Sequence, residues 1–243
     1  MLQEGSVVPG WDWDGVRVCL GRHFLRDMEG LWAGIFRLAG VVEDSLTRCV
    51  RALCEGTPEL LEEVRREERA IDRWEVQIER DCLKILALHQ PVASDLRRVA
   101  VVLRMNSDLE RLGDLSDHIA KRIKKLMAKD PYVFPIPQPL QAMATEALNQ
   151  VHRSLDALAK NDGALARGII ADDRRVDRLY RSVLKELKQE IRRDPERLDT
   201  WLRLINTARN LERVADHATN IAESVVYLKE GDIIRHVASG RDR

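Results

Sequence analysis

The sequence predicts an all-α protein made of two tandem three-helix bundles related by internal duplication and pseudo-two-fold symmetry. Hydrophobic residues recur with the 3.6-residue period of amphipathic helices, and no stretch has the pattern of a strand. A proline-rich segment divides this helical pattern into two runs of three helices. The acidic motif LERLGD at 109–114 recurs as LERVAD at 211–216, and both copies run on into Ile-Ala. The helices and the acidic motif therefore indicate the same duplication.

The composition is typical of long amphipathic helices. The 243 residues are 44% hydrophobic, 33% charged and only 5% aromatic. Basic and acidic residues number 40 each and are interspersed, which argues against nucleic-acid binding. No apolar run approaches the roughly 20 residues of a membrane-spanning helix, so we expect no direct membrane insertion. The cysteines have no metal-site or Cys-x-x-Cys spacing, and we expect reduced packing thiols in a cytosolic protein. They are Cys19, Cys49, Cys54 and Cys82.

In the first half, the pattern predicts helices over 29–53, 57–88 and 94–128. Gly56 closes the first of them. Thr57 is predicted to be the N-cap of the second, with Pro58 in its first turn. Pro91 ends that helix, because the residue before a proline avoids the α region.

In the second half, the pattern predicts helices over 140–160, 164–192 and 195–231. Asp194 is predicted to be the N-cap of the last one. Half of the eight prolines lie between the two halves, so we expect an extended boundary there. The predicted organisation is an N-terminal leader at 1–27, a first repeat at 28–129, a linker at 130–139, a second repeat at 140–236 and a tail at 237–243.

Each half carries two acid pairs with i, i+4 spacing. The pairs border the apolar stripe of their helices, whereas solvated acids usually occupy the opposite face. In the first half, the short connection at Pro91 makes the two acid-bearing helices antiparallel. Asp72 and Glu110 are equally distant from Pro91, as are Glu68 and Asp114, so they should face each other. In the second half, the acids of the two acid-bearing helices are also at nearly equal distances along the chain from Pro195, so they too should lie at one level. The eight candidate metal ligands are Glu68, Asp72, Glu110, Asp114, Asp173, Asp177, Glu212 and Asp216.

Four carboxylates at one level repel one another unless a cation neutralises them. Oxygen ligands favour hard or borderline ions over a thiolate-type zinc site, and the candidates are Fe, Mn, Mg and Zn. The Glu-x-x-His signature of di-iron bundles is absent, which disfavours a redox enzyme. Two alternatives remain open: a metal-dependent enzyme of the carboxylate-bundle type, and a metal-free scaffold whose acids form salt bridges. No catalytic motif is found, so we predict that the chain is not an enzyme.

Other polar residues near the acids have less defined roles. His118 and His217 are predicted to have polar supporting roles rather than to bind metal directly. Glu75 and Glu79 extend the acidic stripe in the first half only, either as part of a larger site or as solvated side chains. The tryptophans at helical spacing are expected to lie in the core or in an interface. They are Trp32, Trp74 and Trp201.

These motifs together resemble those of the PhoU family, bacterial regulators of phosphate uptake. The resemblance covers roughly residues 28–236. It rests on PVASDLR at 91–97, on the two Leu-Glu-Arg motifs, on DHATNIAE at 216–223 and on Gly231 followed by Arg235 and His236. Two features depart from the family pattern. LSDH at 115–118 stands where the family more often has His-x-x-Asn, and residues 1–27 have no family counterpart.

The resemblance implies a function as well as a fold. Family members are cytoplasmic adaptors without enzymatic activity, commonly homodimers, associated peripherally with a membrane transporter complex. They repress the phosphate-starvation response and modulate uptake by coupling the ATPase subunit of a phosphate ABC transporter to a sensor histidine kinase. Some members hold multinuclear metal clusters on their Glu(Asp)-x-x-x-Asp motifs, which in this sequence are the four acid pairs given above.

Overall fold

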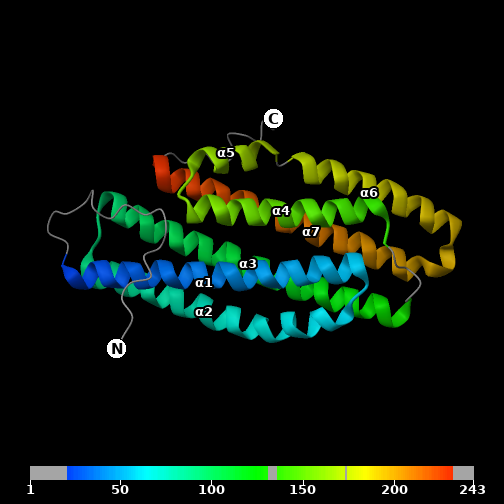
Figure 1. The fold of residues 1–243 in the computed structure, drawn as a ribbon, viewed down its shortest axis with the longest axis horizontal. Helices are drawn as coiled ribbons and strands as arrows, with labels where there is room; N and C mark the ends of the chain where they lie inside the picture. The colour runs from blue at the N-terminus through cyan, green and yellow to red at the C-terminus, as the bar shows by residue number, and fades with distance from the viewer. Residues whose placement is uncertain (1–20, 131–135, 173, 232–243) are drawn as a thin grey trace.

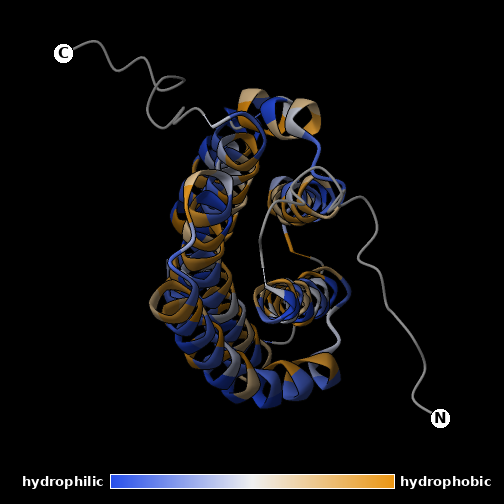
Figure 2. Cartoon of the chain, turned by 90° about the vertical axis from the view of Figure 1, so that its left-hand side faces the viewer, coloured by the Kyte–Doolittle hydropathy of each residue, from blue (hydrophilic) through white to orange (hydrophobic). Residues whose placement is uncertain are grey.

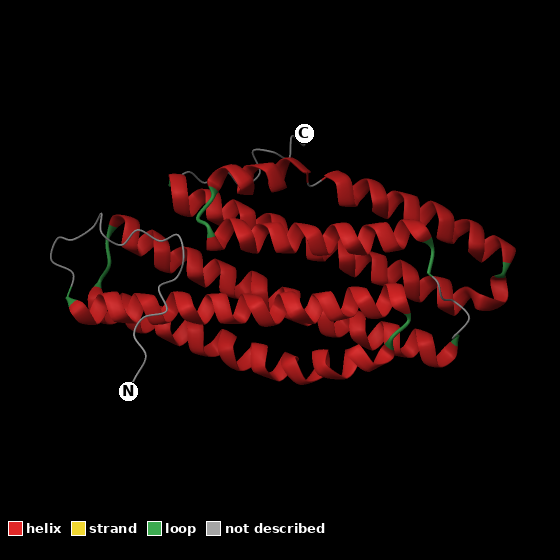
Figure 3. Cartoon of the chain, in the orientation of Figure 1, coloured by secondary structure: helices red, strands yellow, loops and turns green. Residues whose placement is uncertain are grey.

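The computed structural model describes residues 21–130, 136–172 and 174–231, and these form long helices joined by short loops, with no strand among them (Figures 1 and 3). The first repeat contains α1 (Arg22–Glu55), α2 (Leu61–His89) and α3 (Ala93–Lys129). The second contains α4 (Gln138–Ala159), α5 (Gly163–Asp172), α6 (Arg174–Arg193) and α7 (Leu198–Glu230). The predicted all-α, duplicated fold is confirmed.

The two repeats are joined through α3 and α7, which pack against each other along the middle of the molecule. In the view of Figure 2, α2, α3, α7 and α6 form a curved row, and α1 and α4 lie on its inner side. Helix α1 packs on α2 and α3, while α4 packs on α6 and α7. Equivalent helices therefore occupy equivalent places in the two repeats.

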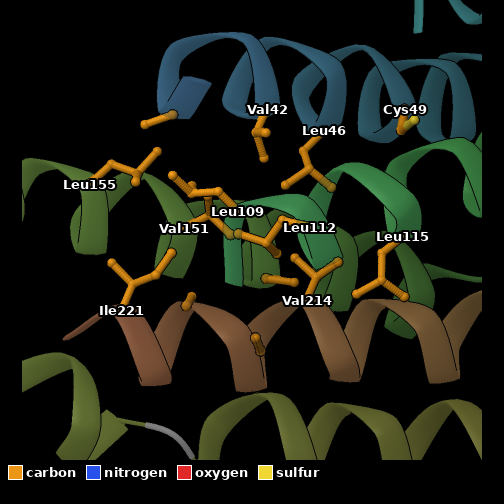
Figure 4. Close-up of a cluster of buried hydrophobic side chains, with 14 of the residues drawn as sticks. Val42, Leu46, Cys49, Leu109, Leu112, Leu115, Val151, Leu155, Val214 and Ile221 are labelled. Carbon is orange, nitrogen blue, oxygen red and sulfur yellow. The ribbon is translucent and has the colours of Figure 1, made fainter. Parts of the chain in front are cut away.

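Both repeats contribute to one hydrophobic core. Figure 4 shows Leu109 and Leu112 of α3 in the same buried cluster as Val151 of α4 and Val214 of α7. Each of these four side chains is at most 1% exposed. Because the cluster spans both repeats, neither repeat buries its apolar face alone. The shared core fixes the position of one repeat against the other.

Polar contacts also connect the repeats. The Nδ1 atom of His217 on α7 lies 2.9 Å from Oδ1 of Asp108 on α3, and Asn220 donates to the same oxygen at 3.2 Å. On the other side of the molecule, His152 Nδ1 of α4 lies 2.5 Å from Oε1 of Glu43 of α1. These partners are far apart in the sequence, and only His217 was predicted to have a polar supporting role.

A further link lies where α3 ends and α7 begins. The Asp130 carboxylate accepts a hydrogen bond from Arg197 Nε at 2.6 Å and one from the Thr200 hydroxyl at 3.0 Å. Lys129 forms an ion pair with Asp199 beside it. This carboxylate therefore secures the first turn of α7 to the end of α3.

The helix starts differ from the predictions. Helix α1 begins at Arg22 rather than near residue 29, because Phe24 and Met28 are buried in the core, so part of the predicted leader is helical. Thr57 and Asp194 occupy N-cap positions followed by proline, as predicted, but their side chains make no cap hydrogen bonds. In both places a 3-10 turn beginning with proline, Pro58–Leu60 or Pro195–Arg197, precedes the α-helix.

The other boundaries lie close to those predicted. Gly56 ends α1 with a φ of 72°, and its N–H donates to the Ala52 carbonyl. The predicted fifth helix corresponds to α5 and α6, and Asp173 between them lies outside the described residues. Residues 131–135 of the predicted linker also lie outside them, as do 232–243. None of the helices in the described ranges has the length and apolarity of a membrane span.

The predicted core positions are largely buried. Trp32 and Trp201 are buried, whereas Trp74 is half-buried with the Arg37 guanidinium 5.5 Å from its ring centroid. Cys49 and Cys82 are buried free thiols, and Cys54 is a partly buried one. Cys19 lies outside the described residues.

Candidate metal centre

The acids of the first repeat lie at the level predicted by counting from Pro91. The Asn106 side chain donates a hydrogen bond from Nδ2 to the Glu75 carbonyl at 2.9 Å, which fixes α3 against α2. On the other side of the acids, Gly113 of α3 lies against Ile71 of α2. These two contacts bracket Asp72 on one helix and Glu110 on the other. The two acids therefore lie at the same depth in the antiparallel pair.

Gly113 allows α2 and α3 to approach closely at the acidic site. A Cβ atom at this position would lie 3.0 Å from the side-chain carbons of Ile71, closer than ordinary van der Waals contact. Glycine is otherwise unfavourable inside a helix by roughly 0.5–1 kcal/mol relative to alanine. Its position between Glu110 and Asp114 thus shortens the distance that the facing carboxylates must span.

The facing carboxylates also influence one another electrostatically. Burial raises the pKa of Glu110, the Asp114 charge raises it further, and Glu75 and Asp72 of α2 add to the effect against Arg111. The pKa of Glu75 is raised by burial and by the charges of Glu79 and Asp72. The repulsion expected from the sequence is thus present across the α2–α3 contact.

The first-repeat acids remain accessible to a ligand from solvent. The side chains of Glu110 and Asp114 are 25% and 36% exposed. Glu68 is half-buried and Asp72 is exposed. The site therefore lies at the surface of the bundle, at the border of its core.

An arginine next to these acids supports the metal-free alternative in part. Arg111 lies 3.5 Å from Glu110 Oε2 and 3.5 Å from Asp114 Oδ2. Its side chain is 55% exposed, and such surface ion pairs contribute about 0–1 kcal/mol. Arg111 lowers the pKa of Glu110, but burial and the Asp114 charge outweigh it, so this pKa stays raised.

A buried carboxylate lies on α3 one helical turn beyond Asp114. Asp117 of α3 is 2% exposed and forms an ion pair with Lys121 one turn later. The charge of Glu68 on α2 also acts on Lys121. Lys121 was not among the predicted site residues, although its i, i+4 spacing from Asp117 is a recognisable ion-pair pattern. His118, predicted to have a supporting role, is exposed.

The described carboxylates of the first repeat are not arranged around a common point as the ligands of a metal ion would be. In residues 21–130, 136–172 and 174–231, no three His, Cys, Asp or Glu side chains converge as they would around one ion. The donor chemistry nevertheless suits a hard cation, because carboxylates on two neighbouring helices lie at one level. The metal assignment of the first-repeat acids stays a prediction.

The second-repeat acids lie on α6 and α7, which pack against each other. Asp177 and Glu212 are half-buried and Asp216 is exposed, whereas Asp173 lies outside the described residues. Here the equivalents of Glu75 and Glu79 are Tyr180 and Leu184. The second acidic site therefore has fewer carboxylates around it, and its metal assignment also stays a prediction.

Both repeats match one family of known proteins. Residues 35–123 and residues 140–225 each match the model of the PhoU domain. The phosphate-specific transport system accessory protein PhoU homolog of Pseudomonas aeruginosa is 33% identical over 226 residues, which cover 91% of each chain. The homolog from Deinococcus radiodurans is 36% identical over 208 residues, covering 84% of this chain and 95% of that protein.

Solved structures are similar as well. The crystal structure of PhoU from Pseudomonas aeruginosa superposes with a TM-score of 0.81 at 33% identity, covering 86% of this chain and all of that one (100%). The phosphate transport system regulatory protein PhoU from Streptococcus pneumoniae gives a TM-score of 0.76 at 28% identity. The similarity thus extends over both repeats in sequence and in structure.

Proposed function

The chain belongs to the PhoU family, and on that premise we propose that it is a non-catalytic regulatory adaptor of phosphate homeostasis. It is an accessory of a phosphate ABC transporter on the cytoplasmic side of the membrane. It contacts the ATPase subunit of the transporter and a sensor histidine kinase, represses phosphate-starvation signalling and modulates phosphate uptake, as a homodimer. One observation carries the proposal: a relative named as a phosphate-transport accessory protein matches over 91% of both chains.

The second part of the proposal concerns the acidic sites. Each repeat holds metal ions between its two acid-bearing helices, and the metal supplies positive charge that neutralises the carboxylates. Asp72 and Glu68 of α2 would hold the ion together with Glu110 and Asp114 of α3. Burial raises the pKa of Glu110 most, and the charges of Asp114, Glu75 and Asp72 add to it. A shared cation would relieve the part of this effect that comes from the neighbouring carboxylates. Bridging α2 and α3 in this way stiffens the bundle and orients its surface for docking.

The regulatory role is tested in cells of the source organism that lack the gene for this chain. A reporter of the phosphate-starvation response should be active in phosphate-rich medium and should be silenced again by a plasmid copy. The purified chain should also retain the transporter ATPase subunit on an affinity column. An unchanged reporter together with an unchanged rate of phosphate uptake would contradict the adaptor role.

The metal sites are tested by elemental analysis of the purified protein. Replacing Glu110 and Asp114 together by alanine should remove about half of the bound metal if the two sites are independent. Replacing Glu212 and Asp216 should remove the other half. As a matched control, Asp156→Ala with Glu190→Ala removes two partly exposed carboxylates elsewhere and should leave the metal content unchanged.

The outcomes separate the alternatives. Metal content that is unchanged in the Glu110→Ala, Asp114→Ala variant excludes the first site. A wild-type chain without stoichiometric metal supports the metal-free scaffold, in which Arg111 serves the acids as their counter-ion. Hydrolytic or redox turnover that rises with the bound metal supports the enzyme alternative.

A further inference from the structure

Helix α6 carries a line of basic side chains along its outer side. Six Lys and Arg residues follow one another at intervals of three or four positions, so at about 100° per residue they fall within an arc of about 80°. The buried side chains of this helix, Val176, Val183 and Leu187, lie on the opposite side. We call these six exposed residues the basic stripe: Arg174, Arg178, Arg181, Lys185, Lys188 and Arg192.

The basic stripe differs from the other basic residues of α6 in having no acidic partner. Arg175 forms an ion pair with Glu146 of α4, and Arg193 forms one with a glutamate one turn earlier. Within the described part of the chain, no carboxylate lies at ion-pair distance from a residue of the basic stripe. Arg181 donates a hydrogen bond from Nε to the backbone carbonyl of Asp177 at 3.2 Å. The charge of the stripe is thus left without a counter-ion among these residues.

This arrangement is unfavourable for the chain by itself. Like charges three or four positions apart on a helix repel each other, and every neighbouring pair of the basic stripe has this spacing. Helix α6 has eight basic and three acidic residues, although the whole sequence has 40 of each. Positive charge concentrated on one helix of a chain without net charge indicates an anionic partner.

The equivalent face of α2 has a different composition. Helix α2 has six basic and eight acidic residues. Val76 and Leu83, both exposed, stand where the basic stripe has Arg181 and Lys188. Three positions are arginine in the first repeat too, namely Arg69, Arg73 and Arg80, the equivalents of Arg174, Arg178 and Lys185. The continuous basic stripe is therefore a property of the second repeat.

The chemistry of the basic stripe fits a layer of anionic headgroups. Protein interfaces are built around apolar and aromatic anchors and are depleted in lysine, and the stripe contains no apolar side chain. Single-stranded nucleic acids bind through aromatic side chains that stack on the bases, which the stripe also lacks. A headgroup layer requires only cations along an exposed line, and the stripe is about 27 Å long. Helix α6 packs on α4 and α7 at one end of the curved row of helices, and the stripe on its outer side is exposed (Figure 2).

We propose that the basic stripe of α6 docks the chain on an anionic phospholipid surface. The guanidinium and ammonium groups lie among the headgroups, and α6 stays packed on its bundle. No apolar side chain of the stripe enters the hydrocarbon layer, so the attachment is electrostatic and reversible. This docking rests on the proposed function, which brings the chain to the cytoplasmic side of a membrane, and it adds a lipid contact beside the transporter.

Sedimentation with lipid vesicles measures the docking of the full chain without the transporter. In low-salt buffer containing EDTA, vesicles of phosphatidylcholine with about one third phosphatidylglycerol should bind the chain, and pure phosphatidylcholine vesicles should not. Arg174→Gln, Arg178→Gln and Lys185→Gln together should weaken this binding roughly a hundredfold. Each basic residue near an anionic surface contributes about fivefold.

The matched control is the combination Arg69→Gln, Arg73→Gln and Arg80→Gln on α2. It removes the same charge from the equivalent positions of the first repeat. Because α2 lies at the other end of the row, farther from α6 than the Debye length of about 10 Å, it should change binding by less than about threefold. Far-UV circular dichroism establishes that both variants are folded.

Equal losses in the two variants would overturn the role of α6, because net charge alone would then account for the binding. Equal binding to both kinds of vesicle, or binding that persists at about 1 M salt, would overturn the electrostatic contact. A chain that does not sediment with anionic vesicles overturns the lipid partner. If that chain binds duplex DNA or polyglutamate, the partner is a nucleic acid or an acidic protein. A normal phosphate-starvation reporter response without vesicle binding overturns the lipid contact and leaves the adaptor role standing.

Discussion

In both repeats, the helix that carries the Leu-Glu-Arg motif buries the same hydrophobic positions. Leu109 of α3 and Leu211 of α7 are each at most 1% exposed, and so are Ile119 and Ile221. These helices pack against each other and against α1 and α4. Because each repeat completes the core of the other, a change at one of these positions affects both. The shared core therefore keeps the two repeats alike.

The surroundings of the acids differ between the same two helices. Gly113 has Ala215 as its equivalent, and Ile71 has Val176. A larger residue on one helix is thus matched by a smaller one on its neighbour, which keeps the total volume nearly constant. Lys121 has Glu223 as its equivalent, which reverses the charge at the edge of the site. Positions at the α2–α3 contact and at the α6–α7 contact can diverge because each contact lies within a single repeat.

The largest effect should come from the shared core. Leu109→Ala and Leu211→Ala should each lower the free energy of unfolding by about 2–5 kcal/mol, since each leaves a cavity in the same core. Urea unfolding, followed by circular dichroism and by tryptophan fluorescence, should show both variants shifting one common transition. The exposed Leu198 provides the control, and Leu198→Ala should change stability by less than about 0.5 kcal/mol. Two separate transitions, each affected by one variant only, would contradict the shared core.

A smaller effect should come from the close contact of α2 and α3. Gly113→Val should lower the free energy of unfolding by about 2 kcal/mol through overpacking against Ile71, although valine has the better helix propensity. Gly113→Ala combined with Ile71→Val copies the residue pair of the second repeat. This variant should stay within about 1 kcal/mol of the wild type in the same urea titration. A fully stable Gly113→Val variant would show that the helices are not tightly packed there.

The smallest effect should come from the repulsion among the acids. Burial and neighbouring charges raise the pKa of Glu110, so the folded chain holds this proton more tightly than the unfolded chain does. Stability conferred by the protonated form is then complete below the ordinary glutamate pKa and is lost as pH rises through the raised one. In metal-free buffer, Glu110→Gln should therefore stabilise the chain by a few tenths of a kcal/mol at pH 7, and the gain should vanish below about pH 4.

Glu212→Gln is the matched variant of the second repeat. Its effect should be smaller, because Tyr180 and Leu184 stand where the first repeat has Glu75 and Glu79. Urea unfolding at pH 4 and pH 7 measures both variants. Equal increases in the free energy of unfolding for Glu110→Gln and Glu212→Gln would show that the additional glutamates of the first repeat contribute no repulsion.

The fold and the level of the acids could be predicted because local patterns determine them. Helical periodicity identified the helices, and the short turn at Pro91 allowed the Asp72–Glu110 level to be counted along the chain. The start of α1 was missed because Phe24 and Met28 precede the continuous apolar pattern, and their burial depends on distant helices. Thr57 lies at the N-cap position of a 3-10 turn that precedes α2, and its hydroxyl makes no cap hydrogen bond.

The connections between repeats could not be predicted in the same way. Asp108 and His217, or Asp130 and Arg197, meet only because α3 and α7 pack together, and no local spacing links them. Lys121 was overlooked for a different reason. An i, i+4 ion pair is common on helix surfaces, and only the burial of Asp117 distinguishes this one.

The carboxylates of α2 and α3 are predicted to face each other across the first site. Carbon-13 NMR of the Glu110 side-chain carboxyl tests this prediction directly, with Glu110→Gln to assign the signal. Glu110 should titrate above the ordinary glutamate value of about 4.3, and Asp72→Asn should move its pKa back toward that value. Saturating Mg²⁺ should lower the pKa in the wild type. A Glu110 pKa that equals the ordinary value and changes neither with Asp72→Asn nor with Mg²⁺ would contradict the account.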